Sequence, residues 1–263
     1  MTEATPLDLA HAAADADPEG EAARMGFYAR LADGELFVLL QHEAEGKAEI
    51  VPRIFPLQDG PVVLAFDTEA RLAGFSGGVA PYAALPGRVL AAQLKGRGIG
   101  LGVNLGVASS SMLLPPEALD WLAMALDNLP DEVEARPVSF RAPGGLPQAL
   151  IAALDPALAR AGNLASGAVL AGVVYDDGRH GHMLAFLDAK PGAEGALAKA
   201  ASEALVFSGV EAGEMDVAFM ARTDAAAISM ARVGLRFELA QPEEREAPRT
   251  GPGFDPQRPP NLR

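Results

Sequence analysis

The sequence contains no cysteine, and this absence removes several kinds of chemistry at once. Disulfides, thiol nucleophiles, and zinc or iron–sulfur centres held by cysteine are all excluded. Long apolar runs are also missing, because no window approaches the ~18 uncharged apolar residues of a membrane span. Residues 1–17 lack the basic start and continuous apolar segment of a signal peptide. We therefore expect a soluble cytoplasmic protein, and no cofactor site is evident.

Positive charge is scarce as well. The chain has 21 Lys and Arg residues against 35 Asp and Glu residues, a net charge of −14 at pH 7. Affinity for nucleic acid and for anionic lipid comes from clustered Lys and Arg. The composition therefore predicts neither a nucleic-acid partner nor a membrane partner. Aromatic residues reach only 6% of the chain, and much of the hydrophobic share is alanine, so we expect helices that pack closely through small side chains.

Residues 19–130 are predicted to form a first lobe, preceded by a loose leader at residues 1–18. Apolar runs of strand length alternate with stretches of helical spacing. Trp121, on the last of these helices, is expected to pack between helix and sheet. The predicted order is a helix from residue 19 to 31, strands at 35–41, 50–55 and 61–66, helices at 69–75 and from 86, strands at 99–105 and 109–114, and a helix from 115.

Residues 131–145, rich in Pro, Glu and Gly, are predicted to be a linker with one short extended stretch at 137–141. A second lobe at 146–240 begins with leucines spaced every four residues, which is typical of a helix. A proline-rich tail at 241–263 has almost no apolar residues and is expected to be disordered. The fold class predicted overall is α+β, with two mixed lobes that each pack a small mixed or antiparallel sheet against helices.

Several short segments of the first lobe resemble the SseB family, the enhanced serine-sensitivity proteins. They are the acidic turn PLQDG at 56–60, a buried strand ending in FDT at 66–68, the helix EARLAGF at 69–75 and the strand GIGLGVN ending at Asn104. The second lobe is similar in its order of elements to the family's C-terminal domain. Asp67 stands where the family often has Thr, and Leu105 where it often has Pro. The resemblance implies a cytoplasmic bacterial two-domain protein, named for a serine-sensitivity phenotype, without established catalytic residues.

One motif suggests catalysis. Residues 74–78, GFSGG, match the G-x-S-x-G pattern that places a nucleophilic serine, here Ser76, on a turn between a strand and a helix. A downstream histidine, His180 or His182, could serve as its base. In this sequence, however, a helix is predicted before the motif and a Gly/Ala/Pro loop after it. That context favours a helix end followed by a loop.

His180 and His182 lie two residues apart on a predicted strand, next to Asp176 and Asp177. Side chains at this spacing share one face of a strand, and nearby carboxylates could complete a site for a divalent metal. The same segment, DDGRHG, is also typical of a solvated hairpin turn. We interpret it as a turn and predict no metal site.

Alternating glycines at 96, 98, 100 and 102 lack the spacing of a dinucleotide-binding loop, and no phosphate-binding lysine follows them. They indicate instead close approach of a neighbouring element. An exposed backbone beside them offers a further hypothesis, which is contact with a ligand or partner at Asn104, Ser109 and Ser110.

Together these patterns predict a non-enzymatic binding or adaptor protein, with no catalytic residues, whose partner is a protein or a small ligand. Two alternatives stay open: a serine-type hydrolase that uses Ser76, and a metal-binding lobe at His180 and His182. A homodimer is a further alternative that the sequence does not settle.

Overall fold

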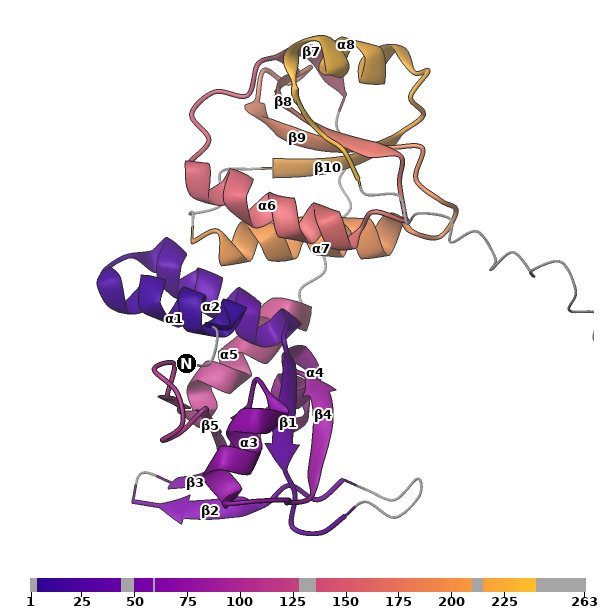
Figure 1. The fold of residues 1–263 in the computed structure, drawn as a ribbon. Helices are drawn as coiled ribbons and strands as arrows, with labels where there is room; N and C mark the ends of the chain where they lie inside the picture. Colours follow the sequence, from indigo (N-terminus) through magenta and orange to yellow (C-terminus); the bar gives the residue numbers. More distant parts are fainter. Residues whose placement is uncertain (1–3, 44–49, 59, 128–135, 210–214, 240–263) are drawn as a thin grey trace, which may run out of the picture.

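The computed structural model describes residues 4–43, 50–58, 60–127, 136–209 and 215–239. Within them the chain forms two lobes, each built on its own mixed sheet (Figure 1). The predicted α+β class with two sheet-containing lobes is therefore confirmed. The segment 241–263, predicted to be a disordered tail, lies outside the described residues. No helix in the described part of the chain combines the length and apolarity needed to cross a membrane.

The first lobe carries a sheet with the strand order β4-β1-β3-β5-β6, and β2 also pairs with β3. Strands β3 and β5 run parallel, while the other pairs are antiparallel. The elements are α1 (Pro6–Ala16), α2 (Glu21–Asp33), β1 (Glu35–Leu39), β2 (Ile54–Leu57), β3 (Gly60–Phe66), α3 (Glu69–Ser76), β4 (Tyr82–Pro86), α4 (Gly87–Leu94), β5 (Gly100–Val103), β6 (Met112–Leu114) and α5 (Pro116–Asp127).

The two faces of this first sheet are covered unequally. On one face, leucines of α2, α4 and α5 pack with strand residues into a large core, as the apolar spacing of these helices requires. A smaller cluster on the other face gathers Leu72 of α3 with Leu64 and Phe66 of β3. Most of the first lobe's apolar burial therefore lies on the side that carries α2, α4 and α5.

The second lobe has the strand order β10-β9-β8-β11, with β7 also paired to β8. Strands β9 and β10 run parallel and the other pairs are antiparallel. Helices α6 and α7 contribute to a core on one face, and α8 packs on the other. The elements are β7 (Pro137–Arg141), α6 (Gln148–Arg160), β8 (Gly167–Tyr175), β9 (His180–Leu187), α7 (Glu194–Phe207), β10 (Met215–Met220), α8 (Ala225–Val233) and β11 (Leu235–Phe237).

The prediction of a loose leader is wrong for residues 6–16, which form α1. Thr5 caps this helix, and Thr5 and Asp8 exchange the two hydrogen bonds of a capping box. Leu7 and His11 are buried, and the ring of His11 lies edge-on to Phe27 of α2. Helix α1 is therefore part of the first lobe.

The extended stretch at 137–141 is not part of a free linker, because it pairs with β8 as strand β7. This portion of the predicted linker belongs to the second sheet. Strand β4 (Tyr82–Pro86) was not predicted, since its residues lie in a Gly/Ala/Pro segment without clear alternation. It forms because β1 pairs with it along its whole length, from Glu35↔Pro86 to Leu39↔Tyr82.

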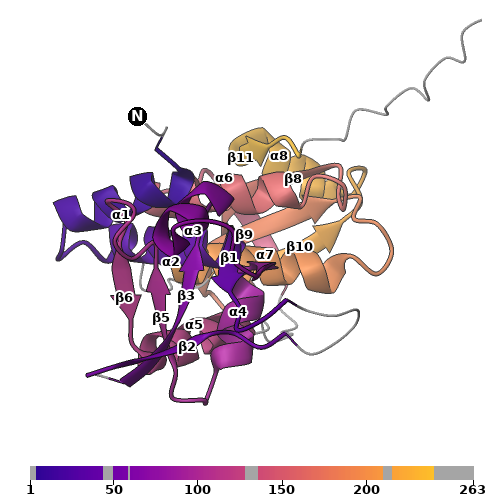
Figure 2. The same ribbon diagram turned by 60° about the horizontal axis from the view of Figure 1, so that its bottom comes forward.

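The two lobes touch through α7, which contacts α2 and α5 (Figures 1 and 2). Phe207 of α7 is buried in the core cluster of the first lobe, with its ring 6.4 Å from that of Trp121. Trp121 is 38% exposed and also lies edge-on to Tyr28. The prediction that it packs between helix and sheet is wrong, because it lies among helices where the lobes meet.

Candidate functional site: the groove between the lobes

Asn104 and Ser110, two of the predicted contact residues, are fully buried, whereas Ser109 is exposed. The amide of Asn104 donates to Ser110 Oγ over 3.0 Å and accepts from the backbone N–H of Asp67. Ser110 donates in turn to Asp8 of α1. In this arrangement Asn104 and Ser110 offer no surface to a ligand, because their polar groups hold α1 against the sheet.

Arg71 of α3 completes this buried network. It forms ion pairs with Asp8 and with Asp67, and the three side chains are 8–10% exposed. Burial alone would raise the pKa of Asp8, but hydrogen bonds from Arg71 and Ser110 outweigh it and hold that pKa well below its usual range. The hydrogen bond to Asp8 likewise raises the pKa of Arg71. Asp8 and Arg71 therefore stay charged, and the ion pairs of Arg71 fix α1 to α3.

Ser76 lies at the C-terminal end of α3, where its hydroxyl donates to the carbonyls of Leu72 and Gly78 at 2.9 and 2.6 Å. Gly77 follows in the left-handed conformation, with φ of 73°. This is the geometry of a helix end, which agrees with the interpretation made from the sequence. A nucleophile elbow instead requires a turn that leads from a strand into a helix.

His180 and His182 both lie on β9, as expected. A ring nitrogen of His182 lies 3.1 Å from the carbonyl oxygen of Gly144, and His180 is exposed. Among the described residues, no group of three or more His, Asp or Glu side chains is arranged to hold a metal ion.

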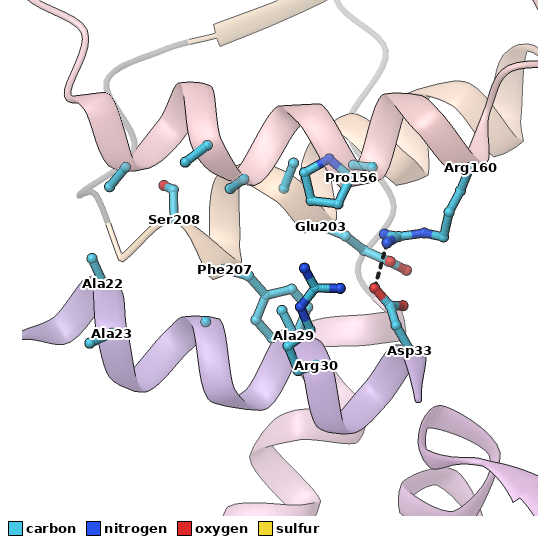
Figure 3. Close-up of a pocket in the computed structure, with 16 residues that line it drawn as sticks. Ala22, Ala23, Ala29, Arg30, Asp33, Pro156, Arg160, Glu203, Phe207 and Ser208 are labelled. Atoms are coloured by element: carbon cyan, nitrogen blue, oxygen red, sulfur yellow. Dashed lines mark ion pairs between the residues drawn. The ribbon is translucent and has the colours of Figure 1, made fainter. Parts of the chain in front are cut away.

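A groove of about 390 Å³ opens between the lobes (Figure 3). Helices α2 and α6 form its walls, and the C-terminal half of α7 forms its floor. Eight alanines and Gly26 make up most of its apolar lining. We call these residues the interlobe groove: Ala22, Ala23, Gly26, Ala29, Arg30, Asp33, Ala149, Ala152, Ala153, Pro156, Ala157, Arg160, Glu203, Ala204, Phe207 and Ser208.

The small side chains explain why the groove exists. Ala22, Gly26 and Ala29 are spaced three and four residues apart on α2, and α6 repeats the pattern with Ala149, Ala152 and Ala153. Residues at this spacing lie on one face of a helix. Side chains this short leave space between two helices that longer residues would fill.

An alternating chain of charges closes one end of the groove. Asp33 of α2 accepts a hydrogen bond from Arg88 at 2.5 Å and forms an ion pair with Arg160 of α6 at 2.6 Å. Arg88 also donates to both carboxylate oxygens of Glu203 on α7. We call these four residues the interlobe clasp. Its Asp33–Arg160 and Arg88–Glu203 pairs each join the two lobes.

Burial by itself would lower the pKa of Arg88, but its hydrogen bonds with Glu203 and Asp33 outweigh this effect and the pKa is raised. The Glu203 side chain is only 7% exposed, and Arg88 is the cation that pairs with it. This pairing makes Arg88 a fixed part of the clasp.

Arg30 reaches into the groove from α2, and Figure 3 shows its guanidinium between Phe207 and the clasp. Within the described part of the chain, no carboxylate forms an ion pair with it. Counting Arg30 with the clasp gives three arginines against two carboxylates, so this end of the groove carries an excess of one positive charge. In a chain with a net charge of −14, that local excess favours an anionic ligand.

Sequence reasoning missed Arg30 and the clasp, because their partners are far apart in the chain and charged residues alone are not distinctive. The one available signal was the stripe of small residues repeated on α2 and α6. The groove offers a ligand guanidinium groups and an apolar lining. Among the described residues that line it, Ser208 has the one hydroxyl, and this group donates to the carbonyl of Leu205.

Comparison with known proteins identifies the first lobe. Residues 7–121 match the family model of the SseB protein N-terminal domain. No curated protein and no solved structure matches the chain. The matched region begins within α1 and ends in α5, so the helix missed by the sequence analysis falls inside it. The likeness of the second lobe to the family's C-terminal domain stays a prediction. The first lobe is therefore similar to the N-terminal domain of the SseB family.

Proposed function

We propose that this protein is a non-enzymatic, cytoplasmic binding protein that holds a small organic anion with an apolar body in the interlobe groove. The observation that carries the proposal is the position of Arg30. Its guanidinium has no carboxylate partner within the described residues and lies beside Phe207 in a groove lined mainly by alanines. A charged group above an apolar floor suits a ligand with the opposite charge at one end and hydrocarbon at the other.

The size of the groove supports a ligand of this kind. Its volume of about 390 Å³ lies in the range typical of small-molecule sites, roughly 300–1,000 Å³. Both lobes contribute walls, so the site depends on the docked arrangement. The serine-sensitivity phenotype implied by the family resemblance does not specify the ligand, and the groove chemistry is the better guide.

The test compares two dyes that share an apolar body and differ in charge. One is 8-anilinonaphthalene-1-sulfonate (ANS), an anion, and the other is N-phenyl-1-naphthylamine, which is neutral. We expect Arg30→Ala to weaken ANS binding about tenfold, since a charge-assisted hydrogen bond is worth ~1.5–3 kcal/mol. The neutral dye should bind the variant and the wild type alike.

A groove-filling variant controls for dye bound elsewhere. Ala152 is exposed on α6 and lines the groove, so Ala152→Phe should remove the groove-specific signal of both dyes. Ala159→Phe places the same ring at an exposed position of α6 outside the groove and should leave the signal unchanged. If Ala152→Phe also leaves it unchanged, the groove is not the binding site and the proposal fails.

A second candidate function is docking of a protein partner, including a second copy of the chain. It is favoured by exposed apolar side chains of the first lobe, where Ile54, Leu57, Phe75 and Tyr82 are 39–51% exposed. If these residues form an interface, Phe75→Asp should abolish an association seen for the wild type by analytical ultracentrifugation. A wild-type chain that sediments as a monomer at high concentration would exclude the homodimer.

A further inference from the structure

Arg160 occupies a different position in the interlobe clasp from Arg88. Its side chain is 46% exposed, and among the described residues it forms one ion pair, with Asp33 across the groove. Arg88 is 35% exposed and is held by both Asp33 and Glu203. The two arginines therefore share Asp33, but within the part of the chain that the structure describes only Arg88 pairs with a second carboxylate.

This unequal sharing makes Arg160 the side chain that can leave. If Arg160 turns away, Asp33 keeps its bond to Arg88 and no carboxylate loses its last partner. If Arg88 left instead, the buried Glu203 would remain as an uncompensated charge, which is strongly unfavourable. The clasp can thus release Arg160 without breaking its second contact between the lobes.

Arg160 and Arg30 face the same space. Figure 3 shows their side chains extending into the groove from opposite walls, near the end where Asp33 lies. Two guanidinium groups that converge from two walls are well suited to an oxyanion, because each presents several N–H donors in a fixed plane. A carboxylate, sulfonate or phosphate monoester group offers the matching acceptors.

We propose that Arg160 is an exchangeable anion-binding residue that releases Asp33 and binds the anionic group of the ligand together with Arg30. This inference rests on the proposed function, since it names the residue that completes the same site. In the free protein, Asp33 occupies the guanidinium that the ligand will use. Asp33 therefore competes with the ligand, and ligand entry exchanges one anion for another at Arg160.

A double-mutant cycle at positions 33 and 160, read by ANS titration, tests this exchange. Arg160→Gln keeps the aliphatic stem and removes the charge, and we expect it to weaken ANS binding about tenfold. Asp33→Asn removes the competitor, and we expect it to tighten ANS binding about fivefold. Neither change should affect binding of neutral N-phenyl-1-naphthylamine.

The decisive comparison is the effect of Asp33→Asn in the Arg160→Gln background. If Asp33 acts by occupying Arg160, Asp33→Asn should tighten ANS binding by less than about twofold in the Arg160→Gln background. If Asp33 acts only by repelling anions, the gain is the same in both backgrounds, and the exchange is overturned. Thermal unfolding of each variant verifies that the fold is retained.

This outcome is distinguishable from failure of the proposed function. When Ala152→Phe abolishes ANS binding but the cycle shows no coupling, the groove binds anions and only the exchange at Arg160 is wrong. When Ala152→Phe has no effect, the proposed function and the exchange both fail.

Discussion

Arg71 and Arg88 each bridge two carboxylates, but their surroundings differ. Arg71 lies inside the first lobe between Asp8 and Asp67, and all three side chains are 8–10% exposed. Arg88 joins the two lobes, is 35% exposed, and shares its partner Asp33 with Arg160. Because the Arg71 network is buried, its charged groups have no other partners to bind. The interlobe clasp is partly exposed, so one of its arginines can exchange its carboxylate for another anion. The first therefore fixes the fold, and the second borders the candidate site.

Removing the buried arginine should have the largest effect on stability. Arg71→Leu would leave Asp8 and Asp67 as buried carboxylates without a cation. We expect the free energy of unfolding to fall by about 3–5 kcal/mol, the usual consequence of breaking a buried pair. Urea denaturation measures it, with Arg24→Leu at an exposed site of α2 as the control. A loss below about 1 kcal/mol would mean that water reaches these carboxylates.

Breaking the contact between the lobes should cause the next largest loss of stability. Phe207→Ala should lower the free energy of unfolding by about 3 kcal/mol, because a nearly buried ring leaves the first-lobe core. Trp121 touches this ring and is the single tryptophan in the chain. Its fluorescence emission should move to longer wavelength in the variant and stay unchanged in Met124→Ala, an exposed position of α5. Unaltered emission in Phe207→Ala would contradict the docked arrangement.

Lowering the pH should weaken the Arg71 network, because Asp8 is then protonated in the unfolded chain. The pKa of Asp8 is lowered in the folded protein, so the unfolded chain binds a proton more readily. The contribution of Asp8 is thus fully present above about pH 5 and is lost as the pH falls below about 3.9, the ordinary aspartate value.

We expect the loss to be on the order of 1 kcal/mol, measured by urea denaturation from pH 6 to pH 3. Asp8→Asn cannot titrate at this position, so its stability should depend less steeply on pH over the same interval. Equal slopes for the variant and the wild type would show that Asp8 is not responsible.

The smallest effect is expected at Ser76, which belongs to neither network. Ser76→Ala removes a hydroxyl at a helix end and should change stability by no more than about 0.5–1 kcal/mol. Labelling by a fluorophosphonate probe should be the same for the variant and the wild type. Labelling that the substitution abolishes would restore the hydrolase hypothesis.

The sequence predicted those elements whose pattern is local. Leu146, Leu150, Leu154 and Leu158 indicated a helix, and α6 buries Leu150, Leu154 and Leu158. Helix α1 was missed although Thr5, Pro6 and Asp8 form a readable capping signal, because its alanines and acids were interpreted as a leader. Strand β4 was missed for another reason, since its pairing with β1 decides its structure and its own residues do not.

The candidate site was beyond sequence reasoning because it is formed by docking. Arg88 and Glu203 are 115 residues apart and meet only when α7 packs on the first lobe. Conversely, Asn104 and Ser110 looked available in the sequence, but α1 covers both. Exposure of a polar residue depends on neighbours that the local pattern does not contain.

The interlobe groove is proposed to bind a small organic anion. Equilibrium dialysis against a cell extract, followed by mass spectrometry of the retained small molecules, tests it most directly when the wild type and Ala152→Phe are compared. We predict an anion with an apolar body that is enriched by the wild type and by Ala159→Phe, and not by Ala152→Phe. The same retained molecules for all three proteins, or none for any of them, would contradict the claim.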